Sequence, residues 1–417
     1  MSEGVDTVGL DTPPRLAVDR LLDDRETRII VCCGAGGVGK TTTAAALGVR
    51  AAARGRKAVV LTIDPARRLA QSMGIDSLDN TPRKVATAGE DGGELHAMML
   101  DMKRTFDEIV EAHADGERAR AILANPFYQS LSAGFAGTQE YMAMEKLGQL
   151  RARDDWDLII VDTPPSRSAL DFLDAPKRLG SFLDGKFIRV LMAPAKVGGR
   201  AGMKFLNVGM SMMTGTLSKL MGASLLKDVQ TFVAAMDTMF GGFRTRADAT
   251  FRLLQAPGTA FLVVAAPEPD ALREAAYFVE RLAAERMPLA GLVLNRVHGS
   301  GADQLSAERA LAAAENLEEG GIVDQESGKA GLRDTAAEPP GADDDTTAVD
   351  RITAGLLRLH AERMQVIARE QRTRDRFTSL HPEVAVAEVA ALPGDVHDLA
   401  GLRAIGERLA AGVPAGA

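Results

Sequence analysis

The stretch TRIIVCCGAGGVGKTTTAAALGVRAAA, residues 27–53, decides the fold. Residues 27–33 are apolar and β-branched, which predicts a short buried strand, and residues 41–53 have the composition of a helix. The same alternation returns along the chain. Further strands are expected at residues 57–64, 157–163, 261–267 and 289–297, and a helix at 271–285. This order predicts an α/β fold with a mostly parallel, doubly wound sheet that is covered by helices on both faces.

Composition indicates a globular protein with an ordinary core. The chain has 417 residues, of which 46% are apolar and 25% charged, and its formal net charge is −8. An acidic chain with only 4% aromatic residues is not typical of nucleic-acid binding, so no nucleic-acid partner is expected. The two cysteines, Cys32 and Cys33, are adjacent and predict neither a crosslink nor a zinc site. Without a visible signal peptide or membrane span, we expect a cytoplasmic protein.

The glycine-rich turn after the first strand has the pattern of a phosphate-binding loop. Residues 34–41, GAGGVGKT, fit G-x-x-x-x-G-K-[ST] between a strand and a helix, which is the context that the motif requires. Glycines let backbone N–H groups surround phosphate oxygens, Lys40 supplies a charge for the β- and γ-phosphates, and Thr41 supplies a hydroxyl ligand for Mg²⁺. We therefore predict binding of ATP and Mg²⁺. The expected nucleotide contacts are Gly34, Gly36, Gly37, Val38, Gly39, Lys40, Thr41 and Thr42.

Two aspartates follow apolar strands. Asp162 ends the strand at 157–163, which predicts a Walker-B carboxylate that holds Mg²⁺ directly or through water. Asp64 ends the strand at 57–64 and allows two interpretations. It is a turn residue supported by Pro65, or it is a carboxylate that faces the γ-phosphate, because ligands bind at the carboxyl ends of parallel strands. These residues alone leave both interpretations open.

In their joint order, the motifs between residues 27 and 409 resemble the arsenite-pump and tail-anchored-protein-targeting ATPase family, which belongs to the deviant-Walker-A dimeric ATPases. IDPARRLAQSMG, from residue 63, resembles the first switch of that family, and DTPPSRSALDFL, from residue 162, resembles the second. The resemblance implies a magnesium-dependent dimeric ATPase. It also implies that Asp64 orients the attacking water and that Lys40 acts with it in catalysis.

The same resemblance extends to the base of the nucleotide. LVLNRV, from residue 292, resembles the strand whose asparagine contacts adenine, which implies this role for Asn295. VAALPGDVHDLAGL, from residue 389, resembles the loop that closes over the base, which implies a contact by Pro393.

The chain departs from the family at Ala35, where relatives carry a lysine that contacts the nucleotide of the partner subunit. Three explanations stay open: a paralogous partner supplies the lysine, Arg67 or Arg167 replaces it, or hydrolysis is slow. We favour the paralogous partner over a homodimer. Ser168 replaces the histidine of the second switch. Arsenite transport is not expected, since As(III) needs clustered thiolates.

Eight of the 17 methionines fall between residues 186 and 245, together with several glycines and basic residues. Methionine adapts to many apolar shapes, so this helical insertion fits a groove for a hydrophobic client or membrane protein. A methionine-rich core or dimer interface, and peripheral contact with an anionic membrane surface, stay open as alternatives. A regulatory subunit of a heteromeric ATPase and the motor of an anion-efflux system are the alternative functions.

These observations predict six segments along the chain. They are an N-terminal extension (1–26), the first part of the ATPase core (27–185), the helical insertion (186–255), the second part of the core (256–298), an acidic flexible insertion (299–347) and a C-terminal helix with the adenine-closing segment (348–417).

Overall fold

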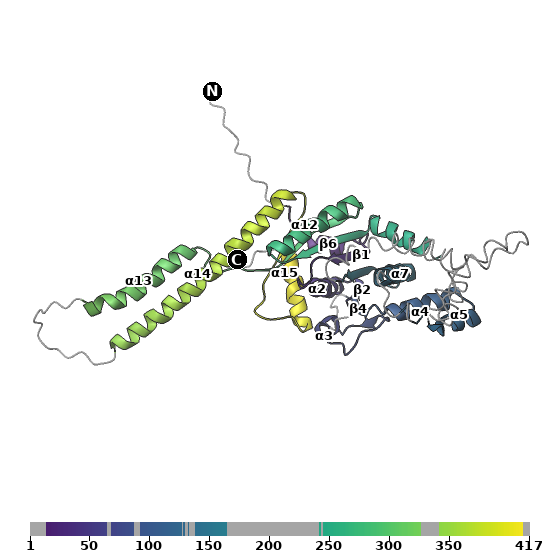
Figure 1. Cartoon of the computed structure of the whole chain (residues 1–417), viewed down its shortest axis with the longest axis horizontal. Helices are drawn as coiled ribbons and strands as arrows, with labels where there is room; N and C mark the ends of the chain where they lie inside the picture. The colour runs from purple at the N-terminus through teal and green to yellow at the C-terminus, as the bar shows by residue number, and fades with distance from the viewer. Residues whose placement is uncertain are drawn as a thin grey trace, which may run out of the picture.

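A computed structural model describes residues 14–64, 68–86, 92–126, 128–129, 132, 138–164, 242, 245–326 and 342–411. Within these ranges the fold is an eight-stranded sheet in the order β3-β4-β2-β5-β1-β6-β7-β8 (Figure 1). All neighbouring strands are parallel except β3 and β4. The predicted α/β class with a mostly parallel sheet is confirmed. The strands are β1 (Ile29–Cys33), β2 (Lys57–Thr62), β3 (Arg83–Lys84), β4 (Glu94–Met99), β5 (Leu158–Asp162), β6 (Thr259–Ala265), β7 (Leu289–Val297) and β8 (Val386–Ala390).

Helices cover both faces of the sheet, because alternate strand residues point to opposite sides. Ile29, Val31 and Cys33 of β1 join one apolar core, while Ile30 and Cys32 join the other. The first core lies under α4 (Met102–His113), α5 (Gly116–Leu123), α7 (Thr138–Arg153) and α12 (Pro269–Ala284). The second lies under α1 (Val18–Asp23), α2 (Lys40–Ala53), α3 (Arg68–Ser72) and α15 (Leu399–Ala411). The sheet is therefore doubly wound.

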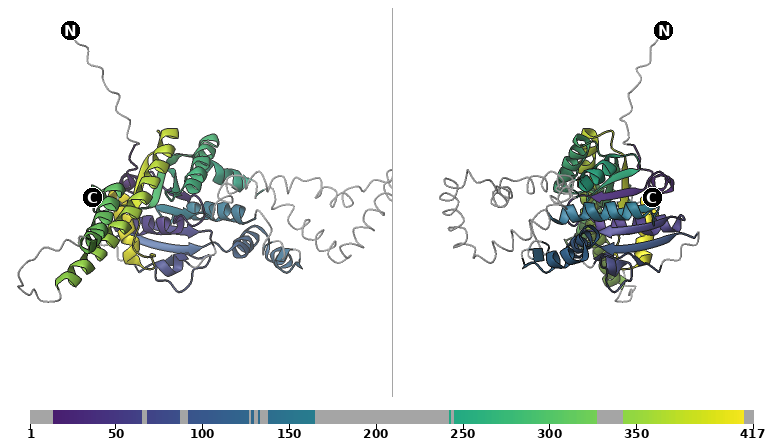
Figure 2. Two further views of the ribbon diagram at one scale, coloured as in Figure 1. Left: turned by 60° about the vertical axis from the view of Figure 1, so that its left-hand side comes forward. Right: turned by 90° about the vertical axis from the view of Figure 1, so that its right-hand side faces the viewer.

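Two helices form a hairpin that reaches away from the sheet. The helices α13 (Ala307–Glu326) and α14 (Ala342–Leu380) pack against each other, and Figure 1 and the left view of Figure 2 show the hairpin leaving the body of the molecule. Only the end of α14 that carries Phe377 joins the first core. Residues 318–326 and 342–347, which the sequence analysis places in the acidic insertion at 299–347, belong to α13 and α14. The reason is tertiary: each helix gains a packing partner in the hairpin, which a reading of composition does not reveal.

The remaining differences concern the edge of the sheet and the insertion. The sequence reading does not include β3 and β4, and β4 pairs along the whole of β2. Most of the methionine-rich segment, residues 186–241, lies outside the described residues, as do Arg67, Arg167 and Ser168. In the described ranges no helix is both long and apolar enough to cross a membrane.

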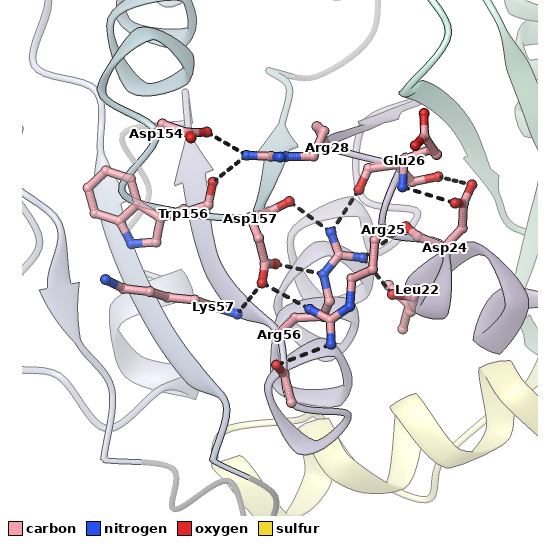
Figure 3. A network of polar contacts seen from close by, with 12 residues as sticks. Leu22, Asp24, Arg25, Glu26, Arg28, Arg56, Lys57, Asp154, Trp156 and Asp157 are labelled. Atoms are coloured by element: carbon pink, nitrogen blue, oxygen red, sulfur yellow. Dashed lines mark hydrogen bonds and ion pairs between the residues drawn. The ribbon is translucent and has the colours of Figure 1, made fainter.

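An arginine ties the amino ends of three central strands together (Figure 3). The side chain of Arg56 is fully buried and donates to the Oδ1 of Asp157 at 2.6 Å. It also donates to the backbone carbonyls of Leu22, Asp24, Thr27 and Asp157 at 2.7 to 3.0 Å. Its charge therefore has a carboxylate partner and its donors have acceptors, as burial of a guanidinium requires. This network fixes the segment that carries α1 against the start of β2 and β5.

Candidate nucleotide site

The loop between β1 and α2 has a backbone that requires glycine at two positions. Gly34 has φ +146°, and a Cβ there would lie 2.0 Å from the carbonyl oxygen of Val264 in β6. Gly39 has φ +96°, and a Cβ there would lie 2.2 Å from Nδ2 of Asn295. Helix α2 begins immediately afterwards at Lys40. The predicted strand, turn and helix are therefore present, and the turn opens at a helix N-terminus, where anions bind.

The Lys40 side chain is buried and folds back over this loop. Its Nζ donates to the carbonyl oxygens of Gly34 at 2.9 Å and Ala35 at 2.6 Å. Burial lowers the pKa of Lys40, whereas the nearby charge of Asp162 raises it. The ammonium is thus held at the loop by two carbonyl groups, in the position from which a loop lysine reaches phosphate.

Asp162 lies at the end of β5 and is fully buried. Its Oδ2 accepts hydrogen bonds from the hydroxyls of Thr41 and Thr62, each at 2.8 Å. Its Oδ1 is also buried and accepts no hydrogen bond from the described residues. Burial raises the pKa of Asp162 to about 6, and the hydrogen bonds from Thr41 and Thr62 oppose this rise. A buried carboxylate with one oxygen unsatisfied is an incomplete polar site, which an additional donor or cation would complete.

These groups fit Mg²⁺, which is bound through one or two carboxylates together with water and substrate phosphates. Thr41 contributes a hydroxyl, and Asp162 contributes the unsatisfied oxygen. In the part of the chain that the structure describes, no cluster of three or more His, Cys, Asp or Glu is placed to hold a metal by itself.

Thr62 is a residue of this site that the sequence analysis does not single out. Its hydroxyl also accepts a hydrogen bond from the backbone N–H of Asp64 at 3.2 Å, so one side chain contacts both aspartate positions. Asp64 is half-buried just after β2, and its charge raises the pKa of both Lys40 and Asp162. The structure places Asp64 near these two groups, but a role in orienting water stays a prediction. A threonine at the end of a strand gives no distinct signal, because this residue type is common in strands.

A cavity of about 790 Å³ adjoins the loop and contains both residues expected at the base. Thr41, Thr42, Asn295 and Pro393 all line it. The Nδ2 of Asn295 donates to the carbonyl oxygen of Val38 at 2.8 Å, so its amide also supports the loop. The contact of Asn295 with adenine therefore stays a prediction, as does the contact of Pro393.

Several further residues in this cavity were not predicted. Arg68 from α3 and His298 after β7 line its wall. Arg296 also lines it and has φ +64°, where the pairing of β7 with β8 shifts register. Left-handed backbone at a residue other than glycine is strained and is often found at binding sites. A bulge in a strand is not visible in a periodic sequence pattern.

Ala35, the position of the departure from the family, is buried beside the loop. It is 8% exposed and packs in the core on the α2 side of the sheet. Its methyl group therefore offers no cation to a neighbouring subunit.

Comparisons with known proteins agree with this geometry. A sequence model of a family described as anion-transporting ATPase matches residues 27–319, from β1 into α13. The ATPase GET3 of Podospora anserina is 27% identical over 299 residues, which cover 70% of this chain and 80% of that protein. The ATPase BagA of Mycobacterium tuberculosis is 30% identical over 168 residues, covering 38% of this chain and 48% of that protein. A putative arsenical pump-driving ATPase of Halobacterium salinarum is 29% identical over 205 residues, covering 46% and 31%.

The match includes the phosphate loop, Asp64, Asp162 and Asn295, whereas Pro393 lies beyond residue 319. The motif, its strand-to-helix context and the family match all lead to the same assignment. The chain belongs to the anion-transporting ATPase family, and it binds nucleotide and hydrolyses ATP.

Proposed function

We propose that this chain is a Mg²⁺-dependent ATPase that works as a dimer and couples its nucleotide state to binding of a hydrophobic client or partner protein. The observation that carries the magnesium-dependent chemistry is the contact of Asp162 with Thr41 and Thr62, which leaves Oδ1 buried and unsatisfied at the phosphate loop. The methionine-rich segment supports the client, and this support comes from the sequence alone.

Each residue has a proposed role that follows from its place. Lys40 binds the β- and γ-phosphates, and the loop N–H groups hold the remaining phosphate oxygens. Thr41 and Asp162 hold Mg²⁺, which neutralises phosphate charge when it is bound. Asp64 orients the attacking water. Thr62 holds the Asp162 carboxylate and the Asp64 backbone in fixed relative positions, so a displacement of one aspartate also displaces the other.

Ala35 favours a second candidate, a regulatory subunit whose paralogous partner supplies the missing lysine. A trans-acting cation can contribute several powers of ten to phosphoryl transfer, so a chain without one is expected to hydrolyse ATP slowly by itself. An efflux motor is a third candidate, suggested by the name of the Halobacterium relative. Its action beside a membrane would agree with a cytoplasmic protein that associates peripherally.

Three measurements test the proposal: the binding of ATP, the turnover of ATP and the identity of the proteins that stay bound. Lys40→Ala is expected to lose ATP binding in calorimetry, whereas Asp64→Asn is expected to bind ATP normally and turn it over at least 10-fold more slowly. Normal ATP affinity in Lys40→Ala would exclude the assigned role of the loop. Unchanged turnover in Asp64→Asn would remove Asp64 from the reaction.

The Asp64→Asn protein, tagged and purified from native cells with ATP and Mg²⁺, then identifies what stays bound. A second phosphate-loop chain with lysine at the position of Ala35 would support the heteromeric ATPase. Membrane proteins with short apolar anchors would support the client. A tagged chain that is recovered alone, both with ATP and without it, would contradict coupling of the nucleotide state to a partner or to a client.

A further inference from the structure

Arg296, near the end of β7, has a backbone conformation that its place in a strand does not explain. In the described part of the chain, three residues other than glycine have left-handed backbone: Asp154, Arg286 and Arg296, with φ +52°, +56° and +64°. Asp154 directly follows α7 and Arg286 follows the C-cap of α12, and a left-handed residue is an ordinary way to end a helix. Arg296 ends no helix, so its strained backbone needs another reason.

This residue is the extra residue of a bulge between β7 and β8. Asn295 lies opposite Val389, and Val297 lies opposite Ala390. The two partners are neighbours in β8, so the described pairing leaves Arg296 as the additional residue of β7. A left-handed residue in a bulge is commonly glycine, because a side chain is disfavoured there. The bulge also interrupts the alternation of side chains along the strand, so the consecutive residues Asn295 and Arg296 both line the nucleotide cavity.

The side chain of Arg296 is exposed and available to a ligand. Among the described residues, its guanidinium makes no hydrogen bond or ion pair. The other two residues that this end of β7 presents to the cavity are engaged. The Nδ2 of Asn295 donates to the carbonyl oxygen of Val38 at 2.8 Å, and the Nδ1 of His298 lies 2.5 Å from the Oε1 of Glu370 in α14. Arg296 is therefore the residue at this wall whose donors and planar face both remain available.

The lining of the cavity divides it into a phosphate end and an apolar end. Gly39, Thr41 and Thr42 form the phosphate end, and residues 390–393 with Val396 form the apolar end. A nucleotide whose phosphates lie at the loop therefore has its base at the apolar end.

The bulge lies beside this apolar end. The N–H of Ala391 donates to the carbonyl oxygen of Val297 at 2.9 Å, so the apolar segment begins next to the bulge. The described residues that line the cavity include no Phe, Tyr or Trp. A flat base that binds there must therefore be covered by another planar group.

We propose that Arg296 is a specificity-determining residue that covers the base of the bound nucleotide with the plane of its guanidinium. A guanidinium is planar and stacks on aromatic faces, and a purine offers such a face over two fused rings. The bulge holds the side chain beside residues 390–393, and the strained backbone is the energetic cost of this position. This inference rests on the proposed binding of nucleotide at the phosphate loop and adds the residue that recognises the base.

Urea unfolding of the full chain without nucleotide tests the strain. Glycine suits left-handed backbone, so the unfolding midpoint is expected to rise in Arg296→Gly. Arg286→Gly is the matched control, because Arg286 is the same residue type with a similar φ but does not line the cavity. The greater chain entropy that glycine gives the unfolded state enters both variants. A midpoint that falls in Arg296→Gly but not in the control would mean that the arginine supports the fold, and would overturn the proposal.

Calorimetric binding of ATP and of inorganic tripolyphosphate, each with Mg²⁺, locates the contact. Arg296→Gly is expected to bind ATP about 5- to 100-fold more weakly than wild type, which is the effect of losing one stacked base, and to bind tripolyphosphate normally. Arg286→Gly is expected to bind both ligands as wild type does. Unchanged ATP affinity in Arg296→Gly would overturn the proposal. Equal weakening of both ligands would also overturn it, because the guanidinium would then contact phosphate.

Two further variants separate charge from shape and base from phosphate. Arg296→Lys keeps the charge without the plane, so its ATP affinity is expected to stay near that of Arg296→Gly. Full recovery of affinity by the lysine would show that charge is sufficient, and would overturn the stacked arrangement. Lys40→Ala is expected to lose affinity for ATP and tripolyphosphate together. Normal binding of both by that variant would contradict the phosphate loop itself, whereas loss in Lys40→Ala without any loss in Arg296→Gly would contradict the role of Arg296 alone.

Discussion

The hydroxyl of Thr62 donates a 2.8 Å hydrogen bond to the Asp162 carboxylate while it accepts a 3.2 Å hydrogen bond from the Asp64 backbone N–H. One side chain at the end of β2 therefore connects the two strand-ending aspartates of the site. Loss of the Thr62 hydroxyl is therefore expected to affect both aspartates.

Thr62→Val keeps the size and the β-branched shape of the side chain but removes the hydroxyl. A hydrogen bond to a charged group contributes about 1.5–3 kcal/mol, so we expect ATP turnover to fall about 10- to 100-fold. The pKa of Asp162 rises further, because a hydrogen bond that lowers it is lost. The measurement is steady-state turnover at a range of Mg²⁺ concentrations. Thr62→Ser, which keeps the hydroxyl, should stay near wild type, and wild-type behaviour of the valine variant would contradict the role.

Asp162→Asn should stabilise the protein without nucleotide or metal at neutral pH. Since burial raises the pKa of Asp162 from 3.8 to about 6, the folded state holds its proton more tightly than the unfolded state. The resulting stability is fully present below pH 3.8 and is lost as the pH rises through about 6. The uncharged amide avoids this loss, so the gain over wild type is expected to be about 1–3 kcal/mol at pH 8 and to shrink toward pH 4.

Denaturant unfolding in EDTA between pH 4 and pH 8 measures this difference, and the variant should also lose magnesium-dependent turnover. An asparagine variant that is less stable than wild type at pH 8 would mean that burial of the Asp162 carboxylate does not destabilise the folded protein at that pH.

Arg56→Met should destabilise the fold far from the nucleotide. The substitution leaves the buried carbonyl groups of Leu22 and Thr27 without this donor, and each buried polar group left unsatisfied costs about 1–3 kcal/mol. Urea unfolding measures the loss. Arg25→Met is the control, because Arg25 contacts the same Asp157 but is 59% exposed, and an exposed pair contributes about 1 kcal/mol or less. Equal losses in the two variants would show that burial does not decide the effect.

Ala35→Lys introduces the lysine that the family resemblance implies at this position of the loop. If two copies of the chain meet through their nucleotide sites, we expect turnover of the isolated chain to rise at least 10-fold, since a cation on the transferring phosphate stabilises the transition state. Ala35→Met matches the length without the charge and should show no rise. Turnover that is the same in both variants would favour a partner or another cation over a homodimer.

The sequence predicts the residues around the phosphate loop better than the strand and the buried arginine that hold the sheet around them. The phosphate loop is readable because glycine, lysine and threonine occur at a fixed spacing between a strand and a helix, and Asp162 is readable because four apolar residues precede it. The sequence does not predict the strand β4, ELHAMM, because the strand is short and contains a glutamate and a histidine. Its pairing along β2 stabilises it despite these two polar residues. Arg56 gives no signal either, since an arginine between Gly55 and Lys57 has the appearance of a surface loop residue until the three strand ends are assembled around it.

The close approach of Gly34 to Val264 has a mechanical consequence. The loop backbone lies directly on β6, because no side chain at residue 34 separates the two. On its other side, the strand β1 that leads into the loop pairs with β5, and Asp162 at the end of β5 accepts a hydrogen bond from Thr41. Any residue larger than glycine at position 34 would therefore push the phosphate loop away from β6 and change its distance from Asp162.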